Sequence, residues 1–228
     1  MFLYKLSKYS SKFGNLYGGA INSDPEPVPQ EPRQRSAIFS EGKNPLLFVF
    51  DCDYTIWPYD CDGPNGYPRG RDVYYPFLRI SNEKVIDRYG NPANSYPDVP
   101  FILGALYDAG IQVAYASRNR SSKYLEELLK AIPLQSQQPG LSLWDCLRGR
   151  KDLFHAYSSG SHNNKLLHFT NIRNVSGIDF SNMVFFDDNN HNVDHAETLG
   201  ITSILLTQAT GLTWDAIDSA LGRWRTRA

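Results

Sequence analysis

Residues 46–58 read LLFVFDCDYTIWP, in which five apolar residues lead directly into an acidic segment. An unbroken apolar run of this length is typical of a strand that is covered on both faces of a parallel sheet. Asp51 and Asp53 follow the run, and Thr55 stands two positions further on. Alternate residues of an extended chain point to the same side, so both carboxyl groups can reach one reacting centre. The segment therefore predicts a buried strand that ends at a functional site.

Strand-like and helix-like segments alternate after this first strand. Apolar strands are expected at 111–116, 152–158, 183–186 and 201–207, and helices at 99–110, 121–132, 165–174, 191–200 and 212–225. Helices between consecutive strands predict parallel pairing with right-handed crossovers. We therefore expect an α/β fold with a doubly wound, three-layer parallel sheet of the Rossmann-like type.

Two helix boundaries carry local signals. Ser121 begins a helical pattern, and its hydroxyl is expected to cap the first turn. Gly110 ends another, because glycine readily adopts the left-handed conformation that stops a helix.

The chain divides into a tail, a domain and an insertion. Residues 1–42 are expected to be a disordered N-terminal tail with a proline-rich linker, because they offer little to bury. The domain is expected at 43–228, and an insertion at 57–98 interrupts the helix and strand pattern. Within the insertion, residues 84–96 predict a hairpin that turns at residues 90–92.

Composition excludes several classes of protein. A net charge of −1 over 228 residues gives no basic surface for nucleic acid. No apolar run approaches the ~20 residues that cross a bilayer. Three cysteines without a C-x-x-C pair indicate neither a disulfide framework nor a zinc ribbon. We therefore expect a cytoplasmic monomer. The alternative is a mitochondrial protein, because the first 23 residues contain lysines and no acidic residue, as a presequence would.

Polar residues follow three of the expected strands at the point where each one ends. They are Asp51, Asp53 and Thr55, then Ser117 to Asn119, then Asp187 to Asn189. Parallel strands end at one edge, so four carboxylates are expected to converge there. Two like charges about 4 Å apart repel by ~4 kcal/mol at an effective dielectric near 20, so a cation is required. Carboxylates favour Mg²⁺ over zinc or copper; simple capping by each Asp is the alternative.

These residues resemble the four ordered motifs of the haloacid dehalogenase superfamily: Asp51-x-Asp53-x-Thr55, Ser117, Lys165 and Asp187-Asp188. The segments FDCDYTIWP, YPDVP, ASR, FFDD and NVD are similar to the eukaryotic magnesium-dependent phosphatase family within it. The resemblance covers about residues 45–215. It implies the haloacid dehalogenase fold, with a small loop and hairpin insertion after the first strand and no large cap domain.

The resemblance implies a role for each acidic position and for one lysine. Asp51 would be the nucleophile that forms an aspartyl-phosphate. Asp53 would protonate the leaving alcohol and then activate water, while its backbone carbonyl binds Mg²⁺. Lys165 would neutralise the charge of the intermediate. Asp187 would be a direct metal ligand, and Asp188 would hold a metal-bound water or orient Lys165, so the metal set is Asp51, Asp53, Asp187 and Asp188.

The expected substrate contacts lie beside the acids. Ser117 would donate a hydrogen bond to a phosphoryl oxygen, and Thr55 belongs to the same motif set. Arg118 has a guanidinium that suits a substrate anion. Trp57 and Tyr59 are expected to line the entrance, with structural packing as the alternative for both. The segment 59–80 is longer and richer in glycine than the family pattern, so the family's substrate pocket is not carried over.

The expected function is Mg²⁺-dependent phosphomonoester hydrolysis through an aspartyl-phosphate. The substrate would be a phosphotyrosine-bearing protein or a small sugar or metabolite phosphate. A catalytically silent module that binds a phosphorylated partner and a phosphotransferase remain the alternatives. A cysteine phosphatase is excluded, because no arginine stands six residues after Cys52, Cys61 or Cys146.

Overall fold

The computed structural model describes residues 36–39, 42–60, 76–81, 84–156 and 165–227. All of them belong to one compact unit, residues 31–228. Of the tail and linker predicted at residues 1–42, residues 1–35 and 40–41 lie outside the described residues. The short 3₁₀ helix η1 (Ser36–Phe39) buries the Phe39 ring edge-on against Phe48, with 5.7 Å between the ring centroids. Packing therefore begins before the predicted domain start at residue 43.

A five-stranded parallel sheet forms the centre of the unit, in the order β5-β4-β1-β6-β7. The strands are β1 (Leu47–Phe50), β4 (Gln112–Ala116), β5 (Phe154–His155), β6 (Met183–Asp187) and β7 (Thr202–Leu205). Every residue of β1 and β6 is buried, as expected for apolar strands covered on both faces. The first strand of the sequence pattern is therefore the central strand of the sheet.

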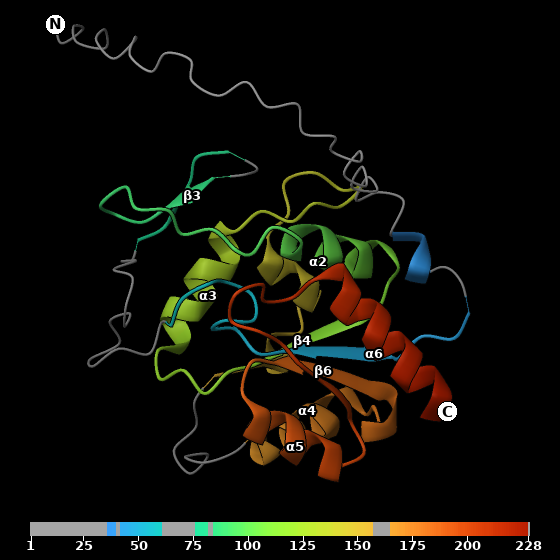
Figure 1. Ribbon diagram of the computed structural model, residues 1–228. Coiled ribbons are helices and arrows are strands. Elements are labelled where there is room, and N and C mark those ends of the chain that lie inside the picture. The colour runs from blue at the N-terminus through green and yellow to red at the C-terminus, as the bar shows by residue number, and fades with distance from the viewer. Residues whose placement is uncertain (1–35, 40–41, 61–75, 82–83, 157–164, 228) are drawn as a thin grey trace, which may run out of the picture. The chain divides into compact units, whose positions relative to one another are not determined.

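Five α-helices connect and cover these strands. They are α2 (Val99–Asp108), α3 (Ser122–Ala131), α4 (Leu166–Ser176), α5 (Asn190–Thr198) and α6 (Trp214–Arg227), joined by the 3₁₀ helices η3 (Leu143–Leu147), η4 (Lys151–Leu153) and η5 (Phe180–Asn182). Figure 1 shows α2 and α6 on one face of the sheet and α4 and α5 on the other. This arrangement confirms the predicted three-layer α/β fold.

The segment predicted as a strand at 152–158 is less regular than expected. Residues 151–153 form η4, only Phe154 and His155 pair with β4, and residues 157 and 158 lie outside the described residues. An edge strand pairs with one neighbour only, and here that pairing covers two residues. The apolar pattern of the sequence does not show where pairing stops, so it overestimates the length of the strand.

The predicted helix boundaries meet with different outcomes. Gly110 has φ +75°, which confirms the left-handed stop after α2. The prediction that the Ser121 side chain caps α3 is wrong, because that side chain makes no capping bond. The side-chain oxygen of Asn119 accepts the Ser121 N–H instead, at 2.8 Å. The asparagine side chain thus forms a turn with the backbone two residues ahead, immediately before α3 begins.

The insertion contains the predicted hairpin and one additional strand. The turn forms at Gly90, with φ +87°, and the Asp87 N–H donates to the Asn91 carbonyl across it at 2.9 Å. β3 (Val85–Ile86) also pairs with β2 (Leu78–Arg79), which the sequence pattern did not predict. Arg79 donates to the Ala131 and Lys130 carbonyls at 2.9 and 3.2 Å, and so attaches the hairpin to the end of α3. Residues 61–75 of the long loop lie outside the described residues.

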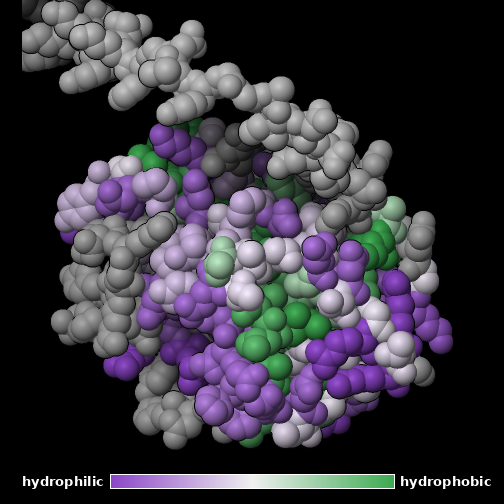
Figure 2. All heavy atoms as spheres, in the orientation of Figure 1, coloured by the Kyte–Doolittle hydropathy of each residue, from purple (hydrophilic) through white to green (hydrophobic). Residues whose placement is uncertain are grey.

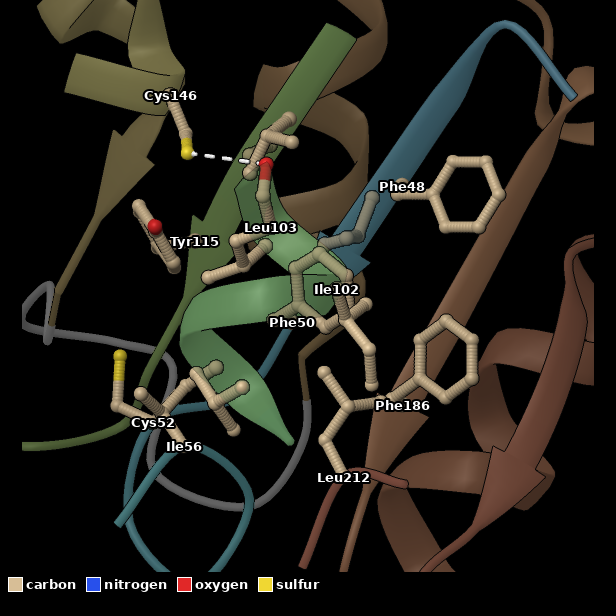
Figure 3. Close-up of a cluster of buried hydrophobic side chains, with 14 of the residues drawn as sticks. Phe48, Phe50, Cys52, Ile56, Ile102, Leu103, Tyr115, Cys146, Phe186 and Leu212 are labelled. Carbon is tan, nitrogen blue, oxygen red and sulfur yellow. Dashed lines mark hydrogen bonds between the residues drawn. The ribbon is translucent and has the colours of Figure 1, made fainter. Parts of the chain in front are cut away.

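Apolar side chains from the central strands and α2 form the core next to the strand ends (Figure 3). The Phe50 and Phe186 rings stack with 5.2 Å between their centroids, and both precede acidic residues. Cys146 donates to the Leu103 carbonyl with Sγ 3.7 Å from the oxygen. Burial raises the pKa of the Cys52 and Cys146 thiols, so neither provides a reactive thiolate.

The surface is mainly polar. Hydrophilic residues cover most of the face in Figure 2, and a hydrophobic patch interrupts them between the positions of α5 and α6. Leu205, at the end of the edge strand β7, is 50% exposed. Among the described helices, none has the length and apolar character that crossing a bilayer requires.

Candidate functional site

Three carboxylates meet at the carboxyl edge of the central strands. Asp51 follows β1 directly, Asp187 ends β6, and Asp188 comes next. One carboxylate oxygen from each residue lies within 4.8 Å of the others. The Asp51 N–H donates to the Phe186 carbonyl at 3.0 Å, which fixes the two strand ends side by side. The predicted convergence of acids from distant parts of the chain is therefore present in the fold.

Lys165 lies between two of these acids. It directly precedes α4, and its side chain is 1% exposed. Its ammonium donates to Asp51 Oδ1 and to Asp187 Oδ2, the latter at 2.6 Å. Burial alone would lower the pKa of Lys165, but the charges of Asp187 and Asp51 outweigh it and raise that pKa. The lysine is therefore held as a buried cation between two strands.

One lysine does not balance the negative charge of the cluster. Burial raises the pKa of Asp51 well above its ordinary value, and the charges of Asp187 and Asp53 raise it further, while Lys165 lowers it. Burial also raises the pKa of Asp188. The site therefore stabilises added positive charge, which is the electrostatic condition for binding a cation.

Two amide side chains hold the acids at the end of β6, and the sequence analysis missed both. Asn192, on α5, donates to Asp187 Oδ2 at 2.9 Å and is 2% exposed. Gln208, after β7, donates to Asp188 Oδ2 at 2.7 Å. Asn192 begins the NVD segment that contributes to the family resemblance, but the sequence assigned no role to it. The role of Gln208 can be identified only from the tertiary structure, in which the loop after β7 brings its side chain to Asp188.

The turn after β1 brings Asp53 back toward the sheet edge. Tyr54 has φ +55°, in the left-handed region that non-glycine residues adopt infrequently. The Ile56 N–H closes the turn by donating to the Cys52 carbonyl at 2.8 Å. Such local strain is common at functional loops, where the surrounding structure maintains it. The Asp53 carboxylate is not one of the three grouped carboxylates, in keeping with a predicted metal contact through its backbone carbonyl.

Trp57 and Tyr59 do not lie at an entrance, contrary to expectation. Trp57 is 0% exposed and Tyr59 is 3% exposed, and their rings stack with centroids 6.1 Å apart. The Trp57 indole N–H donates to Asp53 Oδ1 at 2.8 Å. Both rings are therefore packed in the interior, as the alternative interpretation of these residues expected. Trp57 in addition holds an acid of the site through its indole N–H.

The remaining predicted substrate contacts are Ser117, Arg118 and Thr55, and they differ in where they lie relative to the acids. Ser117 follows β4, is buried, and accepts the Asn119 N–H on Oγ at 3.1 Å. Thr55 is fully buried, and its hydroxyl has no hydrogen-bond partner in the described structure. Arg118 is half-buried and forms no ion pair with the described part of the chain. Ser117 and Arg118 are therefore positioned at the strand edge, whereas Thr55 lies in the interior.

Comparison with known proteins agrees with this geometry. Residues 43–227 match the acid phosphatase family. The chain belongs to this family. It is 32% identical over 160 residues to human magnesium-dependent phosphatase 1, a match that covers 70% of this chain and 77% of the relative. It is 33% identical over 163 residues to a HAD-like hydrolase superfamily protein of Schizosaccharomyces pombe, covering 69% and 83%.

Among solved structures, a phosphatase domain of Bacteroides fragilis complexed with Mg matches with a TM-score of 0.49 and 20% identity. The match covers 82% of this chain, and this chain spans 43% of the length of that one. The sequence relatives confirm the family resemblance that the ordered motifs indicate. The acid cluster described above thus belongs to a phosphatase of the acid phosphatase family.

A pair of histidines lies beside the site of this acid phosphatase family member. His155 ends β5, and His168 lies one turn after Lys165 on α4; their rings stack with centroids 6.2 Å apart. His168 is 1% exposed, and neither of its ring nitrogens has a hydrogen-bond partner among the described residues. Burial, reinforced by the charges of Lys165, His155 and Arg118, lowers the pKa of His168 to about 4.

This histidine is expected to make the fold sensitive to acid. Its pKa is about 4 when folded against 6.5 ordinarily, so the unfolded chain binds the proton first as pH falls below 6.5. Stability should be lost through that window, by ~3 kcal/mol at its lower end. We expect His168→Phe to flatten the decline of urea-unfolding free energy between pH 6.5 and pH 4. The exposed control His191→Phe should keep the wild-type slope, and an equally steep slope in His168→Phe would contradict the assignment.

Proposed function

We propose that this protein is a Mg²⁺-dependent phosphomonoesterase in which Asp51 is the nucleophile. The observation that carries the proposal is the group of Asp51, Asp187 and Asp188 oxygens within 4.8 Å, with Lys165 bonded to two of the three acids. A nucleophilic carboxylate, a cation-binding set and a buried lysine in one place provide what phosphoryl transfer needs, which is positioning and charge stabilisation.

The residues of the cluster fit Mg²⁺. The donor set consists of carboxylate oxygens, which hard divalent cations prefer, and it contains neither thiolate nor imidazole. The raised pKa of Asp51 reflects an excess of buried negative charge that a cation would offset. Asp51, Asp187 and Asp188 would hold the ion. When bound, Mg²⁺ would supply positive charge to the phosphoryl oxygens.

The chain's own residues account for the two chemical steps. Lys165 bonds to Asp51 Oδ1, so Oδ2 is the oxygen available to attack phosphorus. As the new oxygen–phosphorus bond forms, the bond to the leaving alcohol breaks and Asp53 delivers a proton to that oxygen. Water then attacks the phosphorus of the aspartyl-phosphate, gives its proton to Asp53, and releases phosphate with Asp51 restored. Ser117 and Lys165 would stabilise the phosphoryl oxygens during both steps.

The expected substrates are phosphotyrosine-bearing proteins or small sugar and metabolite phosphates. Arg118 supports an anionic contact near the reacting group, because it follows Ser117 and has no ion-pair partner in the described structure. Turnover of p-nitrophenyl phosphate, a phosphotyrosine peptide and a sugar phosphate would rank these classes. Adding a competing alcohol and measuring the phosphorylated product would separate hydrolysis from phosphotransfer.

Magnesium should stabilise the fold as well as support activity. Free Mg²⁺ at about 100 times its dissociation constant would add ~2.7 kcal/mol to the unfolding free energy. We therefore expect MgCl₂ to raise the melting temperature of the wild type and EDTA to reverse that rise and abolish turnover. Asp187→Asn should lose both effects, whereas the exposed Asp218→Asn should keep them.

Two results would count against the metal assignment. One is full turnover of p-nitrophenyl phosphate in EDTA. The other is an unchanged Mg²⁺-dependent rise of the melting temperature in Asp187→Asn. A wild type that binds phosphoesters and Mg²⁺ without turnover would instead support the silent binding module.

A further inference from the structure

Asn119 is a buried side chain at the centre of the site, and the family motifs give it no role. It is 2% exposed and lies in the loop between β4 and α3. Its amide nitrogen donates to Asp53 Oδ2 at 3.1 Å, and its side-chain oxygen accepts the Ser121 N–H at 2.8 Å. Its own backbone N–H donates to Ser117 Oγ at 3.1 Å. One residue thus connects the proposed acid, the proposed phosphate contact and the start of a helix.

We propose that Asn119, together with Trp57, is a positioning residue that orients the Asp53 carboxyl group for proton transfer to the leaving alcohol. This inference rests on the proposed phosphatase function, since it assigns a means of positioning to the acid of that reaction. Asn119 acts through Asp53 and need not touch the substrate.

The orientation of the Asn119 amide is determined by its neighbours. The Ser121 N–H is a donor and requires the oxygen end of the amide. The nitrogen end therefore faces Asp53, where it can only donate. A flipped amide would place a donor against a donor and an acceptor against a carboxylate, losing both bonds.

Trp57 supplies the second donor to the same carboxyl group. Its indole N–H reaches Asp53 Oδ1 at 2.8 Å, while Asn119 reaches Oδ2, so each oxygen is held separately. An indole N–H cannot accept a hydrogen bond, and neither can the amide nitrogen of Asn119. A proton on Asp53 therefore cannot be passed to Trp57 or to Asn119. The two donors thus fix the plane of the carboxyl group without accepting its proton.

The backbone N–H of Asn119 orients the Ser117 hydroxyl by donating a hydrogen bond to it. Ser117 Oγ accepts the Asn119 N–H, so its hydroxyl hydrogen points to another acceptor: the Cys52 sulfur is within hydrogen-bond reach, and a phosphoryl oxygen would compete with it. The acid and the proposed phosphoryl contact are therefore oriented by the same residue, and a shift of this loop would displace both.

The experiment compares leaving groups that depend differently on an acid. p-Nitrophenolate is a stable anion that leaves with little help, whereas the phenolate of phenyl phosphate needs a proton. Both substrates form the same aspartyl-phosphate, so kcat/KM reports the step in which the alcohol leaves. We expect Asn119→Asp, Asn119→Ala and Trp57→Phe to lose at least ~10-fold more kcat/KM on phenyl phosphate than on p-nitrophenyl phosphate.

The variants separate positioning from a loss of structure. Asn119→Asp keeps an oxygen to accept the Ser121 N–H but replaces the donor to Asp53 with an acceptor and adds a negative charge beside it, whereas Asn119→Ala removes donor and acceptor without adding charge. Trp57→Phe retains a buried ring without the N–H, and tests the proposal even if the Asn119 variants do not fold. Ser142→Ala is the control, because it removes a buried capping hydroxyl of η3 that bonds to Asp145 at 2.6 Å, away from Asp53.

The outcomes distinguish failure of the proposed phosphatase function from failure of the positioning role. A wild type that turns over neither ester would refute the proposed function. An active wild type whose folded Asn119 and Trp57 variants lose the same factor on both esters, as Ser142→Ala should, would overturn the positioning role alone.

Discussion

Asp51→Asn is expected to lower turnover of p-nitrophenyl phosphate by at least ~1,000-fold, as removal of a catalytic nucleophile does. The amide cannot form the acyl-phosphate, and the change leaves the shape of the site nearly unaltered. In the absence of divalent cations, we expect the melting temperature to remain unchanged or to rise.

The expected effect on stability follows from the charges around Lys165. In the wild type this one cation serves two buried carboxylates, and burial raises the pKa of Asp51, so its ionised form is destabilised in the fold. Replacing Asp51 with a neutral amide leaves Lys165 paired with Asp187 and removes the excess negative charge. Catalytic acids of this kind are retained for function at the expense of stability.

Steady-state kinetics and thermal unfolding in EDTA test both parts. Asp218→Asn is the matched control, because it removes an exposed carboxylate from α6 and should change neither quantity. Retention of more than a tenth of wild-type activity by Asp51→Asn would remove the nucleophile assignment. A large fall in its melting temperature would show that the ion pair with Lys165 stabilises the fold more than the burial of Asp51 costs.

Gly104→Ala is expected to lower the unfolding free energy by about 3 kcal/mol or more, at the upper end of what overpacking costs. A Cβ atom on Gly104 would lie 1.8 Å from the Gln135 carbonyl oxygen and 2.5 Å from its carbon. The obstacle is backbone, which cannot rotate away as a side chain can. The Gln135 N–H also donates to the Pro100 carbonyl at 3.1 Å, which holds this segment against the start of α2.

Urea unfolding of Gly104→Ala and Gly222→Ala provides the comparison. Gly222 lies in α6, and a Cβ there would meet nothing within 4 Å. The same substitution should therefore stabilise by up to ~1 kcal/mol through helix propensity. The close packing of α2 against residue 135 would be refuted if both variants unfolded at the same or a higher urea concentration than the wild type.

Much of the site was predictable because parallel strands impose one geometric rule. The apolar run before Asp51 and the run before Asp187 each end in an acid, and parallel strands bring such ends to the same edge. Lys165 was predictable only through the family resemblance, because a lone lysine at a helix start indicates a surface position by itself. Its burial depends on α4 lying against the sheet.

The residues that hold the acids in place were not predictable in the same way. Asn119 and Gln208 are residue types common at protein surfaces, and nothing in the sequence around them indicates a role. Asn119 contacts Asp53 across 66 residues, and Gln208 contacts Asp188 across 20 residues. For Trp57 the sequence left two positions open, the entrance of the site or the packed interior, because aromatic side chains next to a site suit either one. Only packing decides between an exposed ring and a buried one, and here it placed the indole N–H on Asp53.

The sequence by itself determined the α/β class, the buried first strand and the acids at its end, because hydrophobic periodicity and chain direction are local properties. The tertiary structure alone decided which polar groups meet those acids and how deeply Lys165 and Trp57 are buried. Those outcomes depend on contacts between segments far apart in the chain, whose distances no local pattern encodes.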